Sequence, residues 1–161
     1  MPKLTDPMDG LRSFQEYLPT GALELQPGRT DPSLFVHLDS PAGEPRLTYV
    51  RLEGEIVAAF VVAVMAGRED GLPVFQLGYA VPEVFRGQGR AKKMLAAAVA
   101  ELTQGLGRNG VQAFFIEAVI ASDNEASQRV AASVFTGQPK VVTDSLSGTP
   151  CFQYMQRIEA A

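Results

Sequence analysis

The pattern of hydrophobic and polar positions divides the chain into strand-like and helical stretches. Residues 46–52, 55–66 and 73–81 are rich in Val, Ile, Leu, Phe and Tyr, which is typical of β-strands. Glu53-Gly54 separates the first two stretches, and the polar segment 68–72 separates the second from the third. Because both separations are short and contain glycine, the three stretches predict consecutive strands of one antiparallel sheet.

Helical spacing begins beyond Pro82. Apolar residues recur there at intervals of three and four, and they define one face of a predicted helix: Ala91, Met94, Leu95, Ala98 and Leu102. We expect Lys92 and Glu101 to lie off this face. We expect the glycines at positions 105, 107 and 110 to end the helix.

The rest of the chain supplies a second strand-helix unit and a closing strand. Residues 111–120 predict a strand, 124–134 a shorter amphipathic helix and 151–158 the last strand. A strand, a long helix and a strand in succession imply a right-handed crossover between two parallel strands. The predicted fold class is therefore α/β (α+β), with a mixed, mostly antiparallel central sheet and flanking helices.

The first 45 residues contain seven prolines, which restrict them to short elements joined by turns. Asp6-Pro7 predicts the start of a helix with three apolar residues on one face: Leu11, Phe14 and Leu18. Residues 34–38 predict a strand. This strand contains the single histidine, His37, for which we expect a structural role because no catalytic partner is near it in the sequence.

Composition narrows the class of protein. With 161 residues, 46% of them hydrophobic and 20% charged, we expect residues 1–161 to form a single domain. The net charge of -4 argues against a nucleic-acid partner. The single cysteine, Cys151, has no partner for a disulfide or a metal knuckle. No signal-peptide pattern opens the chain, and its longest apolar run, 56–66, has 11 residues, whereas a membrane span needs about 20. We expect a cytoplasmic protein without a membrane or a metal.

The most informative segment is Arg-Gly-Gln-Gly-Arg-Ala at 86–91, which links the strand at 73–81 to the predicted helix. The first turn of a helix has free N–H groups and the positive end of the helix dipole, so it can bind a diphosphate without a metal. Gly87 and Gly89 remove side chains that would block phosphate oxygens. Ala91 is small, while Arg86 and Arg90 add positive charge.

Three interpretations compete for this segment before any resemblance is considered. A P-loop requires Gly-x4-Gly-Lys-Ser/Thr, and neither that spacing nor a hydroxyl after Lys92 is present. A dinucleotide-binding fingerprint requires a third glycine at position 92 and a parallel βαβ start, which the preceding hairpin strands do not supply. The remaining alternative is a tight turn with incidental glycines.

The segment resembles the phosphate-binding signature of the GNAT superfamily of N-acetyltransferases. That signature, Arg/Gln-x-x-Gly-x-Gly/Ala, is matched by Arg86, Gly89 and Ala91. The stretches 77–81, 116–118 and 124–127 are similar to the branch that includes ribosomal-protein N-terminal acetyltransferases. The resemblance covers residues 46–157. It implies that these residues form the core sheet and acetyl-CoA site, and that the proline-rich residues 1–45 shape the acceptor side.

The resemblance also implies an arrangement of the site. The strands carrying Val81 and Val119 would splay apart, and the pantetheine arm would pair with backbone between them. Asn124 would reach the arm or the thioester, with Ser127 a weaker candidate. Their alternatives are a helix cap for Asn124 and an ordinary exposed serine for Ser127. The implied cofactor-binding residues are Ala80, Val81, Arg86, Gly87, Gln88, Gly89, Arg90, Ala91, Asn124 and Ser127.

The implied activity is transfer of an acetyl group from acetyl-CoA to a primary amine, by direct attack in a ternary complex. Many members carry a tyrosine seven residues after the helix-opening Asn, where this chain has Ala131. Glu117 is the first candidate general base, acting through water, and Tyr79 is the second. The alternatives for Glu117 are an exposed strand residue or a charge that binds substrate.

Two other classes of protein stay open: a non-catalytic acyl-CoA-binding regulatory domain, and an interaction domain without a ligand. The sequence leaves the acceptor open between a small-molecule amine and a peptide amine. Members of the family often dimerise through their C-terminal strands, so a homodimer is an expectation.

Overall fold

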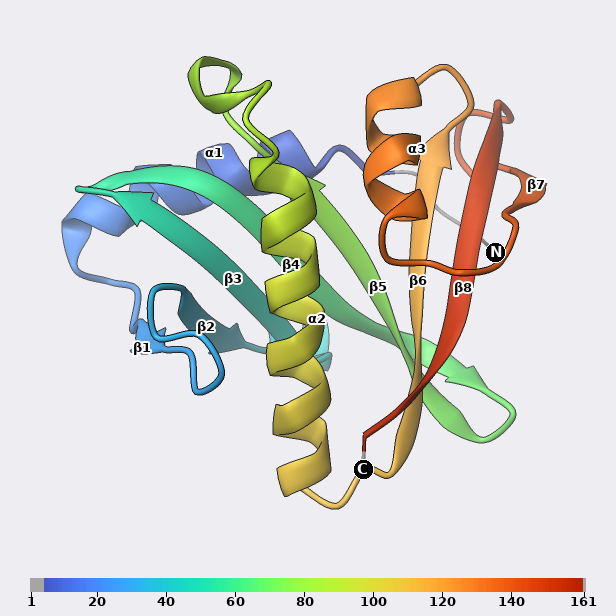
Figure 1. The fold of residues 1–161 in the computed structure, drawn as a ribbon, viewed down its shortest axis with the longest axis horizontal. Helices are drawn as coiled ribbons and strands as arrows, with labels where there is room; N and C mark the ends of the chain where they lie inside the picture. Colours follow the sequence, from blue (N-terminus) through green and yellow to red (C-terminus); the bar gives the residue numbers. More distant parts are fainter. Residues whose placement is uncertain (1–4, 161) are drawn as a thin grey trace.

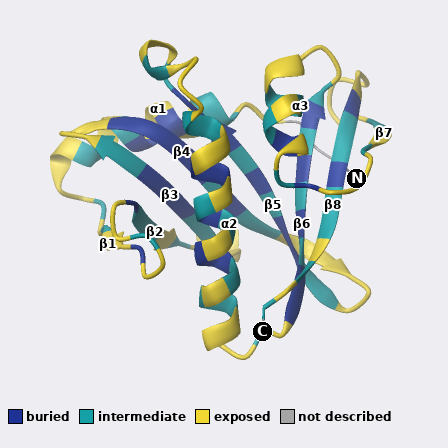
Figure 2. Cartoon of the chain, in the orientation of Figure 1, coloured by how far each residue is buried: buried dark blue, intermediate teal, exposed yellow. Residues whose placement is uncertain are grey.

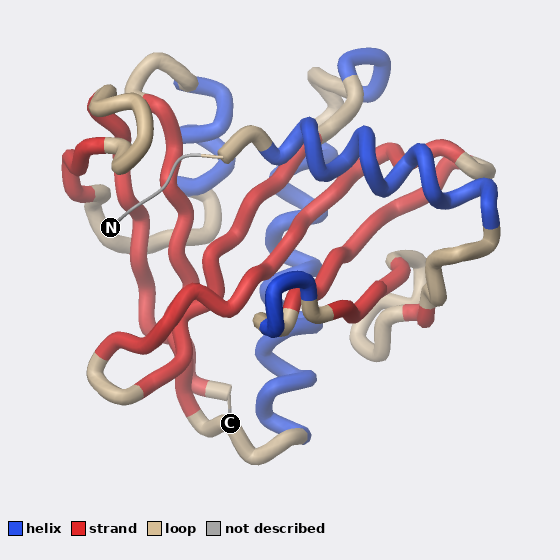
Figure 3. Tube along the Cα trace, turned by 180° about the vertical axis from the view of Figure 1, so that it is seen from behind, coloured by secondary structure: helices blue, strands red, loops and turns tan. Residues whose placement is uncertain are grey.

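The computed structural model describes residues 5–160 and contains an eight-stranded sheet in the order β1-β2-β3-β4-β5-β6-β8-β7, with helices on both faces (Figure 1). Its strands are β1 (Gln26–Pro27), β2 (Phe35–Asp39), β3 (Arg46–Glu53), β4 (Ile56–Glu69), β5 (Leu72–Ala80), β6 (Ala113–Ala121), β7 (Lys140–Thr143) and β8 (Pro150–Glu159). The helices are α1 (Pro7–Tyr17), α2 (Arg90–Arg108) and α3 (Glu125–Ala132). Helices α2 and α3 cover one face, and the view from behind shows α1 across the other (Figure 3).

The predicted fold class is confirmed. Within the described chain, β5 and β6 form the parallel pair, and the other paired strands are antiparallel. Helix α2 makes the crossover from β5 to β6. The hairpin between β4 and β5 turns at Asp70 and Gly71, with φ of 51° and 77°. Two successive positive φ values match the twist of the flanking strands, which explains the Asp-Gly sequence at this turn.

Two hydrophobic cores lie on the two faces of the sheet (Figure 2). The larger one is under α2 and α3, where the predicted stripe of α2 supplies Met94, Leu95, Ala98 and Leu102, each at most 2% exposed. The smaller one is under α1, where Leu11 and Phe14 pack with Phe60. Helices α1 and α2 therefore bury most of the apolar residues that their spacing predicted, whereas on α3 Ala131 is buried and Ala126 is exposed.

The expectation that Glu101 lies off the buried face of α2 is wrong. Its side chain is buried, and its carboxylate accepts hydrogen bonds of 2.6–3.1 Å from the N–H groups of Arg29, Thr30 and Asp31 and from the Thr30 hydroxyl. A Cβ at Gly28 would lie 2.5 Å from Glu101 Oε1. Glu101 thus ties the loop between β1 and β2 to α2, a contact between segments far apart in sequence.

The expectation that glycines at 105 and 107 end α2 is also wrong, because the helix continues to Arg108. Gly107 lies against the C-terminal strand, where a Cβ would come within 3.0 Å of the Ala160 carbonyl oxygen. The absence of a side chain at Gly107 therefore lets α2 pack closely against Ala160. A glycine inside a helix costs roughly 1 kcal/mol. Gly110, with φ of 84°, lies beyond the helix end, as predicted.

Two short strands, β1 and β7, were not predicted. Lys140 and Val141 of β7 are exposed, so no run of buried apolar residues marks this edge strand. Its partner β8 buries Cys151 completely. The thiol is therefore structural, and burial raises its pKa.

Candidate functional site

The site begins where β5 and β6 separate. They are paired only at Val74–Phe115, Phe75–Ile116 and Gln76–Glu117. Beyond these pairs, the strands diverge toward the first turns of α2 and α3 (Figure 1). Beyond the three pairs, the backbone N–H and C=O groups of β5 that face β6 have no hydrogen-bond partner on that strand. Such groups need another partner. This opening is the splay that the resemblance to the GNAT superfamily implied.

The loop after β5 leads into α2 through two glycines with left-handed backbone. Gly87 and Gly89 have φ of 77° and 74°, a region that other residues rarely adopt. Gly89 caps α2 without a side chain, and the first helical hydrogen bond is from Lys93 N to Gly89 O, at 3.2 Å. The first-turn N–H groups of residues 90–92 therefore have no intrahelical acceptor. They form the positive end of the helix dipole.

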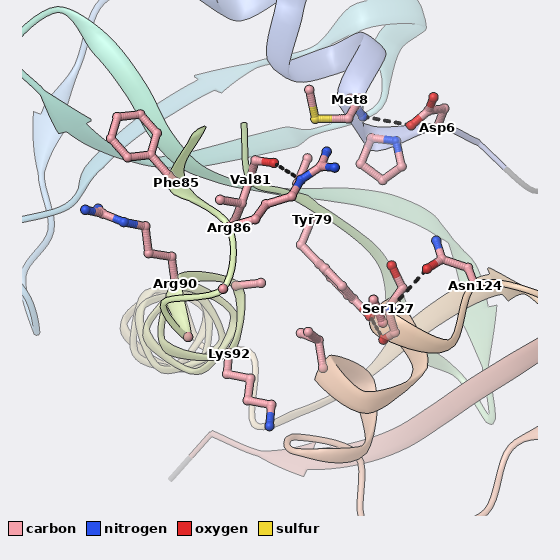
Figure 4. Close-up of a pocket in the computed structure, with 17 residues that line it drawn as sticks. Asp6, Met8, Tyr79, Val81, Phe85, Arg86, Arg90, Lys92, Asn124 and Ser127 are labelled. Carbon is pink, nitrogen blue, oxygen red and sulfur yellow. Dashed lines mark hydrogen bonds between the residues drawn. The ribbon is translucent and has the colours of Figure 1, made fainter. Parts of the chain in front are cut away.

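A cavity of about 510 Å³ joins this loop to the end of β5 and the start of α3 (Figure 4). We call it the loop cavity. The predicted residues that line it are Tyr79, Ala80, Val81, Arg86, Gly87, Gly89, Arg90, Ala91, Asn124 and Ser127. Gln88 and Glu117 are not among its lining residues. The structure thus brings together two segments, 79–91 and 124–127, that are separated by α2 and β6.

The positive charges around the loop differ in what they contact. Arg86 donates from Nε to the Val81 carbonyl at 2.8 Å, which holds the loop against β5. Arg90 stacks on Phe85 and donates to Glu53 at 3.1 Å, so its charge is shared with a carboxylate. Lys92 lines the cavity from the first turn of α2. Lys92 was not predicted to line the site. Its position in the helical pattern indicates only that it lies off the apolar face of α2.

Tyr79 connects the two sides of the splay. Its hydroxyl donates a hydrogen bond to the Ser127 carbonyl on α3. Burial, together with nearby Tyr154, raises the pKa of Tyr79 well above its usual range, so the phenol keeps its proton at neutral pH. The role of Tyr79 in proton transfer stays a prediction. Asn124 Oδ1 accepts from Ser127 N at 3.1 Å, so Asn124 caps α3 while lining the cavity.

Glu117 lies at the last parallel pair, where the strands begin to separate. Its carboxylate accepts a hydrogen bond of 2.6 Å from Gln153 Nε2 on β8. The side chain is half-buried and lines none of the cavities near the splay. Its role as general base stays a prediction.

Two further cavities continue from the loop cavity. The splay cavity, of about 460 Å³, lies between the separated ends of β5 and β6. The helix cavity, of about 450 Å³, lies between α1 and the sheet. Asp6 and Pro7 line all three cavities. Sequence reasoning identified Asp6 only as the start of a helix, which it is: Asp6 Oδ1 accepts from Met8 N at 3.0 Å.

In residues 5–160, no cluster of three or more His, Cys, Asp or Glu side chains is placed to hold a metal ion. No helix in that range has both the length and the apolar character needed to cross a membrane.

The chain matches no protein-family model and no curated protein sequence, but it is similar to solved acetyltransferase structures. One is the ribosomal L7/L12 alpha-N-protein acetyltransferase RimL in complex with coenzyme A, with 22% identity, a TM-score of 0.53, and coverage of 72% of this chain and 64% of that one. A second is Mycobacterium smegmatis RimJ with CoA-disulfide, with 16% identity, a TM-score of 0.57, and coverage of 74% and 58%.

The NatC complex bound to Gag peptide and CoA is also similar, with 16% identity, a TM-score of 0.54, and coverage of 96% of this chain and 83% of that one. The matches to RimL and RimJ span less than two thirds of those chains. Together with a GNAT-family structure from Desulfovibrio desulfuricans, these neighbours show that the chain has the GNAT acetyltransferase fold.

Proposed function

We propose that the protein is an N-acetyltransferase that moves the acetyl group of acetyl-CoA to a primary amine by direct attack in a ternary complex. One observation carries the proposal: the end of β5 that is not paired with β6 opens into the same cavity as the glycine loop and first turn of α2. A diphosphate and an extended amide-bearing arm need these two features side by side. The shared fold supports the same conclusion.

Each part of the donor substrate has a matching feature. The N–H groups of the first turn of α2, with Arg86 and Lys92, suit the pyrophosphate. The unpaired backbone near Ala80 and Val81 suits the amide groups of the pantetheine arm. Asn124 and Ser127 close the cavity on the opposite side. Arg90 contributes less charge because Glu53 pairs with it.

The reaction then follows from placing an amine at the thioester. The substrate ammonium loses a proton, and its nitrogen lone pair attacks the thioester carbonyl carbon. A C–N bond forms, the C–S bond breaks, and the CoA thiolate leaves with the bonding electrons and takes up a proton. Thiols titrate near about 8.5, so proximity and orientation supply most of the rate and no protein nucleophile is needed.

Tyr79 is our candidate for the donor of that proton. The family position for a tyrosine is Ala131 here, and Ala131 is fully buried on α3. The phenol of Tyr79 reaches the same helix from β5, because its hydroxyl bonds to the Ser127 carbonyl one turn before Ala131. In the proposal, Tyr79 on β5 takes the place of the family tyrosine that α3 lacks.

Calorimetric titration with acetyl-CoA, desulfo-CoA and ATP tests the donor site. We expect both CoA species to bind to the wild type more tightly than ATP does. Gly89→Trp should abolish binding, because it blocks the loop and forces a side chain onto φ of 74°. Gly110→Trp is the matched control: its φ is 84°, its Cβ position is also open, and it lies at the other end of α2.

An amine panel then tests turnover. Binding of CoA without acetylation of any amine would identify a non-catalytic acyl-CoA-binding protein instead. Absence of CoA binding by a folded wild type would refute the proposal.

A further inference from the structure

We propose that the acceptor is a primary amine attached to an apolar, preferably aromatic, group. In this proposal Asp6 binds the ammonium of the acceptor, and the helix cavity holds the apolar group. The inference rests on the proposed acetyltransferase function and adds to it the acceptor class and the residues that select it.

The three cavities are neighbours, and in our proposal the acceptor extends from one to the next. The loop and splay cavities share Tyr79, Asn124 and Ser127, and the splay and helix cavities share Thr5, Asp6 and Pro7. The cofactor loop lies at one end of this series. In the proposal, a molecule that occupies the helix cavity and reaches toward the thioester passes Asp6 and Pro7, which line all three cavities. Figure 4 shows Asp6 there, beside Met8 and on the same side of the cavity as Asn124.

Asp6 can serve as a cap and bind a cation at once. Its Oδ1 accepts from Met8 N, and the side chain is exposed at the junction of the cavities. A carboxylate offers about four acceptor sites on two oxygens, so Oδ2 stays available to an ammonium. The other carboxylate among the lining residues of the three cavities, Asp39, is held by Arg46 through two hydrogen bonds of 2.9 and 2.6 Å. Asp6 therefore supplies the negative charge on this route.

One part of the helix cavity is apolar and can hold an apolar group, while Ser13, Arg46 and Thr48 line other parts of it. Phe14 and Phe60 meet edge to face, with ring centroids 6.2 Å apart, and Val62 and Val64 lie beside them on β4. The edge of His37 packs against Phe14, and its Nδ1 bonds to the Glu24 carbonyl at 3.0 Å. A volume of about 450 Å³ lies in the range of small-ligand sites. A second cationic group, as in a polyamine, would have no matching carboxylate in this cavity, because Asp39 is paired with Arg46.

The same chemistry occurs in a free arylalkylamine and in the N-terminal residue of a peptide that begins with phenylalanine. Steady-state acetylation should therefore compare 2-phenylethylamine, a phenylalanyl peptide, a seryl peptide and spermidine. We expect kcat/KM for the better of the two phenyl acceptors to exceed that for the seryl peptide and spermidine at least tenfold. Which phenyl acceptor is better identifies the source of the natural one.

Asp6→Asn tests the carboxylate without removing the helix cap, because Asn and Asp are equally good caps. We expect kcat/KM for the phenyl acceptor to fall about 100-fold, mainly through KM for the amine, with KM for acetyl-CoA unchanged. The matched control, Asp9→Asn, makes the same charge change on the first turn of α1, where the side chain is 77% exposed and outside the cavities. It should change kcat/KM less than twofold.

Ser13→Trp tests the cavity, because Ser13 is an exposed residue of α1 that lines it. We expect it to lower activity with 2-phenylethylamine at least tenfold more than activity with ethylamine. Equal kinetics of Asp6→Asn and wild type, or a preference for spermidine or the seryl peptide, would overturn the acceptor assignment. So would a wild type that binds acetyl-CoA and acetylates none of these amines. A wild type that does not bind acetyl-CoA would instead overturn the proposed function itself.

Discussion

Tyr79 has a role that its position in a buried strand does not suggest. Its ring is packed in the core while its hydroxyl reaches across the splay to α3. The high pKa caused by burial keeps the phenol protonated. In the proposed reaction Tyr79 donates a proton to the leaving sulfur, and general acid catalysis contributes roughly 10²-fold or more.

Tyr79→Phe should therefore lower kcat about 100-fold and leave KM for acetyl-CoA nearly unchanged. Steady-state kinetics at neutral pH measure both. Tyr49→Phe is the control, because Tyr49 is equally buried but lines none of the three cavities of the site. Equal losses in the two variants would show that only packing is affected.

At the residue scale, the sequence predicts those functional residues whose chemistry is local. Gly87 and Gly89 are recognisable because they lie between a predicted strand and a predicted helix, in a segment that resembles the GNAT phosphate-binding signature. Asp6 and Lys92 also have local interpretations, as a cap and as a polar helix position. Their nearness to the cavity results from the packing of α1 and α3 near β5, which no local pattern encodes.

At the scale of elements, Glu101 fastens the loop between β1 and β2 to α2. Glu101→Gln keeps the shape of the side chain but replaces one acceptor oxygen with an NH2 group that faces N–H donors. We expect the free energy of unfolding to fall by about 1–3 kcal/mol, the cost of an unsatisfied buried group. Urea unfolding measures the change. Glu16→Gln on the exposed part of α1 is the control and should be nearly neutral. A loss of less than about 0.5 kcal/mol in the free energy of unfolding would contradict the proposed role of Glu101 in holding this loop.

The predictability of elements follows from their burial. Strands β3 to β6 and helix α2 were predicted because they are long and bury apolar residues in a regular pattern. Strands β1 and β7 are short and largely exposed, and their pairing depends on neighbours placed by the rest of the fold. The end of α2 was misplaced for a similar reason: Gly107 is selected by contact with Ala160 and not by the helix itself.

At the scale of the whole molecule, three carboxylates make stability depend on pH. Hydrogen bonds from Ser33 and Arg51 lower the pKa of Asp31 to about 2. Arg46 lowers the pKa of Asp39. Burial opposes ionisation of Glu101, but hydrogen bonds from Thr30 and the loop backbone prevail and lower its pKa. A lowered pKa in the folded state means that the unfolded chain binds protons more readily as the pH falls.

The stabilisation from these groups should be complete above about pH 5 and be lost progressively as the pH falls toward about 2. Urea unfolding at about pH 6 and about pH 2.5 measures the loss. Asp31→Asn should be less stable than wild type at the higher pH and closer to it at the lower one. If wild type and Asp31→Asn differed equally in free energy of unfolding at both pH values, the lowered pKa of Asp31 would not account for the pH dependence.

The short parallel ladder has a mechanical consequence. Five strands lie on one side of it and three on the other, and three residue pairs join β5 to β6. Three residue pairs are a short connection, so the angle between the two halves of the sheet depends little on hydrogen bonds between β5 and β6. An extended ligand that formed hydrogen bonds with the separated parts of both β5 and β6 would bridge them as an added strand does. It would then fix the angle between strands β1–β5 and strands β6, β7 and β8. Catalytic geometry across the gap, from Tyr79 to α3, would then be set by the substrate as much as by the protein.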